Sequence, residues 1–161
     1  MLKLYLDTSA IVKRYVAEPG TETVDAIFDK AETGELTIAL SLWNIGETLG
    51  VLDERRRRGW LTQEEFERTL KNLANEFLKL VRLRVLETIL IHTSILTETW
   101  ALILNHHIYE ADALQITTCM QSQSNALVSS DKRLVQISRK TGLEAFHIVN
   151  DEEKINALLK R

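Results

Sequence analysis

Short apolar runs recur along the chain, and a longer stretch with helical periodicity separates each run from the next. The runs are too short for core helices and have the length of buried strands. Strands that alternate with helical segments predict βα units around a parallel sheet, which is the α/β class. One run, residues 85–91, is ambiguous because it can also lead directly into a helix. The five runs are Leu2–Leu6, Leu36–Leu40, Val85–Ile91, Ala126–Ser129 and Phe146–Val149.

The stretches between these runs carry signals for helix starts and ends. Pro19 and Gly20 end the first helical stretch. Thr62 and Glu65 have the spacing of a capping box, and apolar residues then recur every three or four positions up to Leu80, which marks one helix face. The predicted helices are Ser9–Val16, Thr21–Glu32, Ser41–Arg58, Phe66–Leu80, Thr93–Leu104, Ala111–Gln121, Asp131–Gly142 and a terminal helix that opens at Asn150.

Length and composition predict one ordered domain. The chain has 161 residues, and domains hold roughly 150 residues, so a single domain over residues 1–161 is expected. Apolar residues make up 45% of the chain and the net charge is −3, which argues against disorder. The acidic total also argues against a nucleic-acid partner, because proteins that bind nucleic acids are commonly basic.

The remaining composition favours a cytoplasmic location. Cys119 is the single cysteine and cannot form an intramolecular disulfide, which fits a reducing compartment. It lies in an apolar helical stretch, so we expect a buried free thiol. The apolar run before Asp7 is too short for a signal peptide, and no stretch approaches the roughly 18 apolar residues of a membrane span. We therefore expect a soluble cytoplasmic domain that binds no membrane.

Four carboxylates stand out by position. Asp7 lies at the carboxyl end of the first predicted strand, and Asp131 lies just beyond the carboxyl end of the fourth. Ligands of open α/β sheets bind in the crevice outside the carboxyl ends of the strands, so these two residues are candidates to face one crevice. Asp112 opens a later helix. Glu47 is the only charged residue in an otherwise apolar or neutral helical segment, where a lone carboxylate needs a partner, a metal ion or a cleft.

Each aspartate also fits a purely structural role, because aspartate is a preferred helix N-cap. If the four carboxylates do converge, however, they repel one another. A hard divalent cation with oxygen ligands, Mg²⁺ or Mn²⁺, removes that repulsion. The four histidines have no zinc-ligand spacing, and we interpret them as surface or core residues.

Several segments together resemble PIN-domain proteins of the VapC toxin type. No single segment is specific, but their order and separation fit the family over nearly the whole chain. Gln115 stands where family members often carry a histidine, and we expect no effect because the position lies outside the four acidic residues. The segments are Asp7–Tyr15, Glu18–Gly20, Trp43–Glu47, Asp112–Ile116 and Ser129–Leu134.

The resemblance implies a three-layer α/β/α sandwich with a central parallel sheet of four or five strands. It implies a toxin endoribonuclease that hydrolyses RNA phosphodiesters with one or two Mg²⁺ or Mn²⁺ ions, leaving a 5′ phosphate and a 3′ hydroxyl. A homodimer and a small antitoxin partner are also implied. The resemblance assigns catalysis and metal binding to Asp7, Glu47, Asp112 and Asp131, with supporting hydroxyls on Thr8, Ser9 and Ser129.

A basic stretch weakens the argument that the negative net charge makes against a nucleic-acid partner. Residues 54–84 hold nine Lys or Arg and five Asp or Glu, a local net charge of +4. The densest part is a run of arginines that suits the negative end of a helix dipole and has a plain interpretation as a solvated helix end. The functional alternative is a phosphate-binding surface for RNA with an aromatic ring beside it. Its candidate residues are Arg55, Arg56, Arg57, Arg58 and Trp60.

Large apolar side chains give two further expectations. Trp43 and Trp100 occupy helical apolar positions, so both are expected in the core. The segments 66–81 and 100–104 supply more apolar surface than a small sheet needs, which favours a homodimer interface.

Other functions fit the residues less well or stay open. A haloacid-dehalogenase phosphatase needs a second acid two residues after the first, where this chain has Ser9. A response-regulator receiver needs a lysine at the end of its last strand, and residues 146–150 contain none. A PIN-type nuclease of RNA processing and a non-catalytic RNA- or protein-binding scaffold both remain as alternatives.

Overall fold

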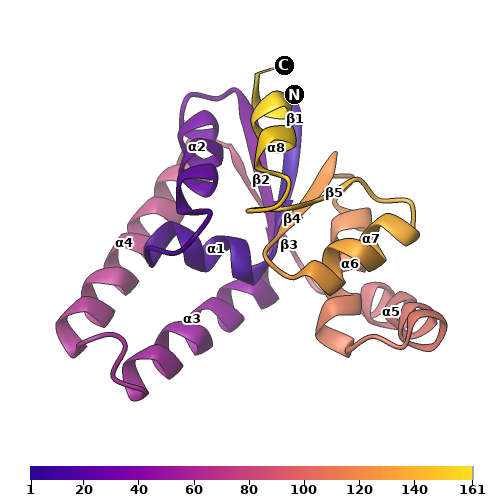
Figure 1. Ribbon diagram of the computed structural model, residues 1–161, viewed down its shortest axis with the longest axis horizontal. Helices are drawn as coiled ribbons and strands as arrows, with labels where there is room; N and C mark the ends of the chain where they lie inside the picture. Colours follow the sequence, from indigo (N-terminus) through magenta and orange to yellow (C-terminus); the bar gives the residue numbers. More distant parts are fainter. Residues whose placement is uncertain (161) are drawn as a thin grey trace.

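Five parallel strands form one central sheet, and helices pack on both of its faces (Figure 1). The computed structural model describes residues 1–160. The strands are β1 (Leu2–Leu6), β2 (Leu36–Ser41), β3 (Leu86–Ile89), β4 (Ala126–Ser129) and β5 (Ala145–His147). The helices are α1 (Thr8–Tyr15), α2 (Thr21–Glu32), α3 (Leu42–Arg57), α4 (Gln63–Arg82), α5 (Thr93–His106), α6 (Glu110–Gln121), α7 (Lys132–Lys140) and α8 (Glu152–Leu159).

The order of the strands creates a crevice in the middle of the sheet. The order is β3-β2-β1-β4-β5, so the first strand of the chain is the central one. The chain moves outward from β1 to β3 and then returns to the other side of β1 as β4. This reversal makes a topological switch point between β1 and β4, beyond whose carboxyl ends ligands bind in open α/β sheets.

Two hydrophobic cores lie on the two faces of the sheet. Successive side chains of a strand point to opposite faces. Leu4 and Leu6 accordingly belong to one core, with residues of α1 to α4 and α8, whereas Tyr5 belongs to the other, with residues of α6 and α7. Burial on both faces explains why the strands appear in the sequence as continuous apolar runs. The α/β/α sandwich expected from the sequence is therefore confirmed.

Most predicted elements are present, with small shifts at their ends. The ambiguous residues 85–91 hold strand β3, followed by α5 from Thr93. The last strand begins one residue earlier than predicted and ends at His147. The N-cap of helix α8 is Asp151 rather than Asn150, and the backbone N–H groups of Lys154 and Ile155 donate to its carbonyl.

The turn between α1 and α2 requires glycine. Gly20 has a φ of +93°, and a Cβ at this position would lie 2.4 Å from Cγ2 of Ile148. Such a contact is too close for any larger residue. The Pro19-Gly20 sequence thus ends the first helical segment and packs the turn against the chain that follows β5.

Two core predictions are wrong. Trp43 is 47% exposed and Trp100 is 59% exposed. Both lie on helices that carry apolar side chains on more than one face, so periodicity alone does not decide which face meets the sheet. Cys119 is buried with a free thiol, as predicted. Among residues 1–160, no helix is both long enough and apolar enough to cross a membrane.

Candidate active site

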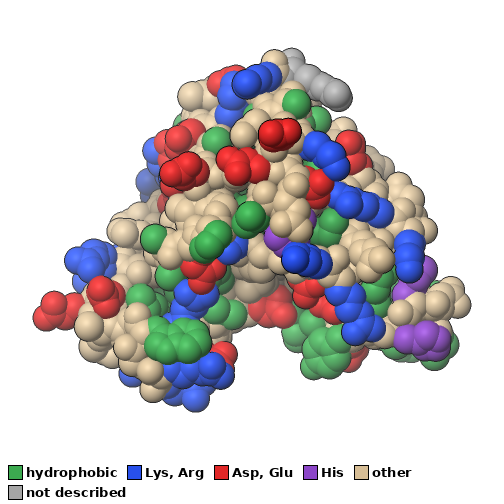
Figure 2. Space-filling view, in the orientation of Figure 1, with side chains coloured by type: hydrophobic (Ala, Val, Ile, Leu, Met, Phe, Trp, Pro, Cys, Tyr) green, Lys and Arg blue, Asp and Glu red, His purple; other side chains and the backbone are tan. Residues whose placement is uncertain are grey.

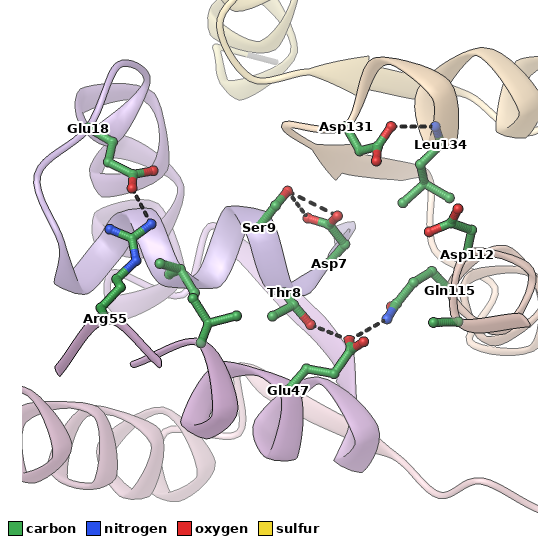
Figure 3. Close-up of a pocket in the computed structure, with 13 residues that line it drawn as sticks. Asp7, Thr8, Ser9, Glu18, Glu47, Arg55, Asp112, Gln115, Asp131 and Leu134 are labelled. Atoms are coloured by element: carbon green, nitrogen blue, oxygen red, sulfur yellow. Dashed lines mark hydrogen bonds and ion pairs between the residues drawn. The ribbon is translucent and has the colours of Figure 1, made fainter. Parts of the chain in front are cut away.

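A pocket of about 300 Å³ opens at the switch point between β1 and β4. In Figure 2 the molecule is hollowed on this side, and acidic side chains lie within the hollow. The pocket collects residues from the β1–α1 junction, α3, α6 and the β4–α7 junction, which are far apart in the sequence. Figure 3 shows four carboxylates arranged around its space, those of Asp7, Glu47, Asp112 and Asp131.

Asp7 is the most deeply buried of these carboxylates, with 5% of the residue exposed. It caps α1 by accepting a hydrogen bond from the backbone N–H of Ala10 at 2.9 Å. Ser9 Oγ donates to its Oδ1 at 2.7 Å, and Ser129 Oγ donates to its Oδ2 at 2.6 Å. Burial raises the pKa of Asp7 to about 6, although the hydrogen bonds from both serines act in the opposite direction.

The same two serines join the two strand ends that form the pocket. Ser9 Oγ accepts from the backbone N–H of Ser130 at 2.7 Å, and Ser129 Oγ accepts from the backbone N–H of Asp131 at 2.9 Å. Each hydroxyl therefore donates its single proton to Asp7; Ser9 reaches the other strand end through the bond it accepts from Ser130, and Ser129 reaches it through the bond it donates to Asp7. The result fixes the β4–α7 junction against the start of α1.

Asp131 combines a capping role with a place in the pocket. Its Oδ1 accepts from two backbone N–H groups in the first turn of α7, at 2.7 and 3.0 Å. Its Oδ2 accepts no hydrogen bond from any residue between 1 and 160. One oxygen of this exposed carboxylate is therefore available to a ligand in the pocket.

Glu47 faces the pocket from α3. Thr8 Oγ1 donates to its Oε2 at 2.6 Å, and Gln115 Nε2 donates to the same oxygen at 3.1 Å. Gln115 lies 68 residues further along the chain and is 4% exposed. Gln115 lies outside the four acidic residues, but its amide contacts one of them. That glutamine in place of the family's histidine has no effect stays a prediction.

Asp112 differs from the other two aspartates because it is not the cap of its helix. The N-cap of α6 is Tyr109, which makes no side-chain capping bond. Within the described chain, residues 1–160, the Asp112 carboxylate accepts no hydrogen bond. Partial burial raises its pKa, and the nearby charges of Asp131 and Glu47 raise it further, against a lowering by Arg133. A carboxylate without a partner in a negative pocket is suited to bind a cation.

The donor set of the pocket fits Mg²⁺ or Mn²⁺. Both ions prefer hard oxygen ligands, and the pocket offers carboxylates that repel one another across it. No three His, Cys, Asp or Glu side chains in residues 1–160 lie close enough to form a ready-made metal site. Mg²⁺ usually keeps several waters and takes only one or two carboxylates directly, so the wider spacing is compatible with it.

The arginine run divides into one pocket residue and three surface residues. Arg55 lines the pocket and forms an ion pair with Glu18, which also pairs with Lys13 at 2.9 Å. The other three arginines pair with acids of α3 itself, Arg56 and Arg57 with Asp53 and Arg58 with Glu54.

Trp60 lies outside the residues that line the pocket. Its side chain is 64% exposed, and the guanidinium of Arg58 lies 5.2 Å from the centre of its ring. The structure therefore brings Arg55 to the acidic site and leaves the rest of the predicted RNA-binding surface beyond its rim.

The fold and the pocket together define a parallel α/β/α protein with an acidic site at its switch point. Residues 4–140 match the sequence model of the PIN domain, and the chain belongs to the PIN domain family. The predicted resemblance is thereby confirmed. PIN domains are generally nucleases.

Solved structures share this fold at low sequence identity. PAE2754 from Pyrobaculum aerophilum has a TM-score of 0.65 and 17% identity over 97% of this chain and 90% of its own. FitAcB from Neisseria gonorrhoeae has a TM-score of 0.64 and 17% identity over 91% and 99%. VapC20 from Mycobacterium tuberculosis, a toxin that cleaves the sarcin–ricin loop, has a TM-score of 0.59 and 13% identity over 87% and 95%. Among curated proteins, no significant match to the sequence exists.

Proposed function

We propose that the protein is a divalent-metal-dependent endoribonuclease whose active site is the pocket between β1 and β4. The observation that carries the proposal is the convergence of four carboxylates from four separate segments on one pocket of about 300 Å³. They lie close enough for the charge of Asp131 to raise the pKa of both Asp7 and Asp112. Four carboxylates that repel one another lower the stability of the fold, and a bound cation offsets that loss.

The pocket residues have two kinds of role in the proposed reaction, metal binding and phosphate binding. One or two Mg²⁺ or Mn²⁺ ions held by the four carboxylates would lower the pKa of an attacking water and stabilise the charge on the leaving 3′ oxygen. Asp7, Glu47, Asp112 and Asp131 act as ligands and not as nucleophiles. Arg55 binds a phosphate of the substrate at the rim of the pocket. Hydrolysis leaves a 5′ phosphate and a 3′ hydroxyl.

RNA is the proposed substrate, and a toxin role is the proposed context. The supporting likeness is to VapC20, which shares the fold and cleaves the sarcin–ricin loop. In this role the chain forms a homodimer through apolar side chains that the monomer leaves exposed, and a small antitoxin protein holds it inactive. A short reading frame directly upstream that encodes a small DNA-binding protein supports the toxin role. A PIN nuclease of RNA processing has no need of such a neighbour.

A cleavage assay with Asp7→Asn tests the proposal. RNA is incubated with the wild type in Mg²⁺, in Mn²⁺ and in EDTA, and the products are resolved on a denaturing gel. We expect cleavage in either metal and none in EDTA, because removal of the cation leaves water without activation. Asp7→Asn keeps the fold, since Asn still accepts the capping bond of Ala10, and its cleavage rate falls below detection.

Asp29→Asn is the matched control, because the Asp29 side chain is 72% exposed on α2 and lies outside the pocket. Its rate equals that of the wild type. Cleavage by Asp7→Asn at the wild-type rate in Mg²⁺ contradicts the proposed mechanism. Absence of divalent-dependent cleavage of any RNA by the wild type favours the non-catalytic scaffold.

A further inference from the structure

Behind Glu47 lies a buried hydrogen-bonded network of uncharged side chains. Tyr5 and Asn44 are each 0% exposed and Gln115 is 4% exposed. Tyr5 Oη lies 2.9 Å from Gln115 Oε1 and 3.0 Å from Asn44 Oδ1. Asn44 Nδ2 donates to Gln115 Oε1 at 2.8 Å and to Thr8 Oγ1 at 3.1 Å. The network therefore joins β1, α3 and α6 beneath the floor of the pocket.

The direction of every hydrogen bond in this network follows from one backbone group. The N–H of Ser41 donates to Asn44 Oδ1 at 2.8 Å, as part of the capping box of α3. A backbone N–H is always a donor, so the oxygen of the Asn44 amide must face it and the NH₂ group must face away. That NH₂ group then meets the oxygen of the Gln115 amide. A flipped amide at either position would set donor against donor.

The fixed orientations of these side chains determine which hydrogen bonds Glu47 accepts. Gln115 must present its NH₂ group to Glu47, and Thr8, which accepts from Asn44, must turn its own proton to the same carboxylate. Both bonds end on Oε2, at 3.1 and 2.6 Å. Oε1 of Glu47 receives no hydrogen bond from residues 1–160. Figure 3 shows Thr8 and Gln115 on either side of this carboxylate.

We propose that Gln115 is a positioning residue that holds Glu47 with one oxygen tied to the protein and the other free to bind a divalent cation. The inference rests on the proposed function, because it assigns Glu47 a cation to bind. It adds a residue that carries no charge and contributes no metal ligand. The Tyr5 hydroxyl and the Asn44 amide act one step further back, by fixing the orientation of the Gln115 amide.

A network with a purely structural role would predict a different outcome. Buried polar groups stabilise a fold when all of them are paired, and removal of one partner then lowers stability. Such a loss affects the unfolding free energy and leaves the affinity of the folded protein for a metal ion unchanged. If Gln115 positions Glu47, its replacement lowers the metal affinity of the folded protein. Replacing a group that orients a metal ligand typically changes metal affinity or activity by about 10- to 100-fold.

The test compares Gln115→Leu with the matched variant Gln121→Leu. Gln121 ends the same helix, α6, and its amide donates to Glu98 on the surface and not to a pocket residue. Mn²⁺ affinity is measured by calorimetry on the full chain without RNA. We expect Gln115→Leu to weaken Mn²⁺ binding about 10-fold and Gln121→Leu to leave it unchanged. Tyr5→Phe, which touches Gln115 and not Glu47, weakens binding by a smaller factor.

RNA cleavage gives the second readout. Gln115→Leu lowers kcat by about 10-fold or more with KM for RNA within about twofold of the wild type, because the inference gives Gln115 a role in orienting a metal ligand and none in substrate binding. Wild-type Mn²⁺ affinity in Gln115→Leu overturns the inference, as does a wild type that binds no Mn²⁺. A protein that binds Mn²⁺ but cleaves no RNA overturns the proposed function alone, and the comparison of affinities still decides the role of Gln115.

Discussion

The Asp7 carboxylate caps a helix and lines the pocket at the same time. Its two oxygens accept from the Ala10 N–H and from two serine hydroxyls, and the side chain still faces the other acids. Capping and ligation are therefore not alternatives at this position. The helix start places the carboxylate at the end of β1, and burial behind it gives the carboxylate its raised pKa.

The raised pKa of Asp7 predicts how stability depends on pH without metal. Its folded-state pKa of about 6 lies above the ordinary 3.8, so folding favours the protonated form. That contribution is fully present below pH 3.8 and is lost as pH rises through 6. Asp7→Asn has no charge to bury, so its unfolding free energy exceeds that of the wild type above pH 6, by at most about 3 kcal/mol.

Urea denaturation in EDTA between pH 4 and pH 8 measures this difference. The difference in unfolding free energy between Asp7→Asn and the wild type decreases toward acid pH and reaches zero near the ordinary pKa of aspartate. Asp29→Asn, with an exposed side chain, follows the wild type at every pH. A difference in unfolding free energy that stays constant between pH 4 and pH 8 would be due to hydrogen bonding and not to the buried charge.

Gln115 shows where prediction from the sequence stops at this scale. A glutamine inside a helix is ordinary, and its partner Glu47 lies 68 positions away. The acidic residues were predictable because a carboxylate after a strand or within an apolar segment requires a helix to cap, a charged partner, a metal ion or a cleft. An uncharged amide within a helix has no such requirement. The role of the Gln115 amide becomes visible only when α6 packs against α3 and β1.

At the scale of elements, capping and periodicity predicted the helices well. The Thr62–Glu65 capping box begins α4, and the apolar spacing that follows it buries Leu73 and Leu80. Orientation was harder to predict. Trp43 on α3 and Trp100 on α5 are exposed because these helices present apolar residues on more than one face, and the faces next to the sheet were taken by other side chains.

The end of α3 predicts a difference between its arginines. Arg55 lines the pocket, whereas Arg57 points to solvent with 64% of its side chain exposed and pairs with Asp53. We expect Arg55→Gln to raise KM for RNA about 10-fold, since a hydrogen bond to a charged group contributes about 1.5–3 kcal/mol. The salt dependence of RNA binding also becomes shallower by about one phosphate contact.

Arg57→Gln is the comparison within the same helix, and its KM stays within about twofold of the wild type because Arg57 lies outside the residues that line the pocket. Binding is measured by fluorescence anisotropy at several salt concentrations. Equal effects of the two variants assign binding to the general charge of the helix end and remove Arg55 from the site.

At the scale of the whole molecule, α3 and α5 leave several apolar side chains uncovered, and Trp43 of α3 and Leu96 of α5 line one cavity together. The exposed side chains include Leu42, Trp43, Leu96, Trp100 and Leu104. Exposed apolar side chains that lie together mark interaction sites on soluble proteins. For the proposed homodimer we expect a dimer mass by light scattering, and a shift to the monomer in Trp100→Glu.

Leu83→Glu, an exposed apolar position outside the two segments predicted for the interface, is the control and keeps the dimer. The secondary structure of both variants is checked by circular dichroism. Elution of the wild type as a monomer over a wide range of concentrations contradicts the dimer.

The order of the strands has a consequence for the biosynthesis of the protein. The central strand β1 is translated first, whereas β4, which pairs beside it and carries Ser129 and the approach to Asp131, is translated after more than three quarters of the chain. Chains are made from the N-terminus, so Asp7 leaves the ribosome long before the residues that complete its surroundings. Under the proposed function, a nascent chain is thus inert beside its own messenger RNA until translation is nearly complete.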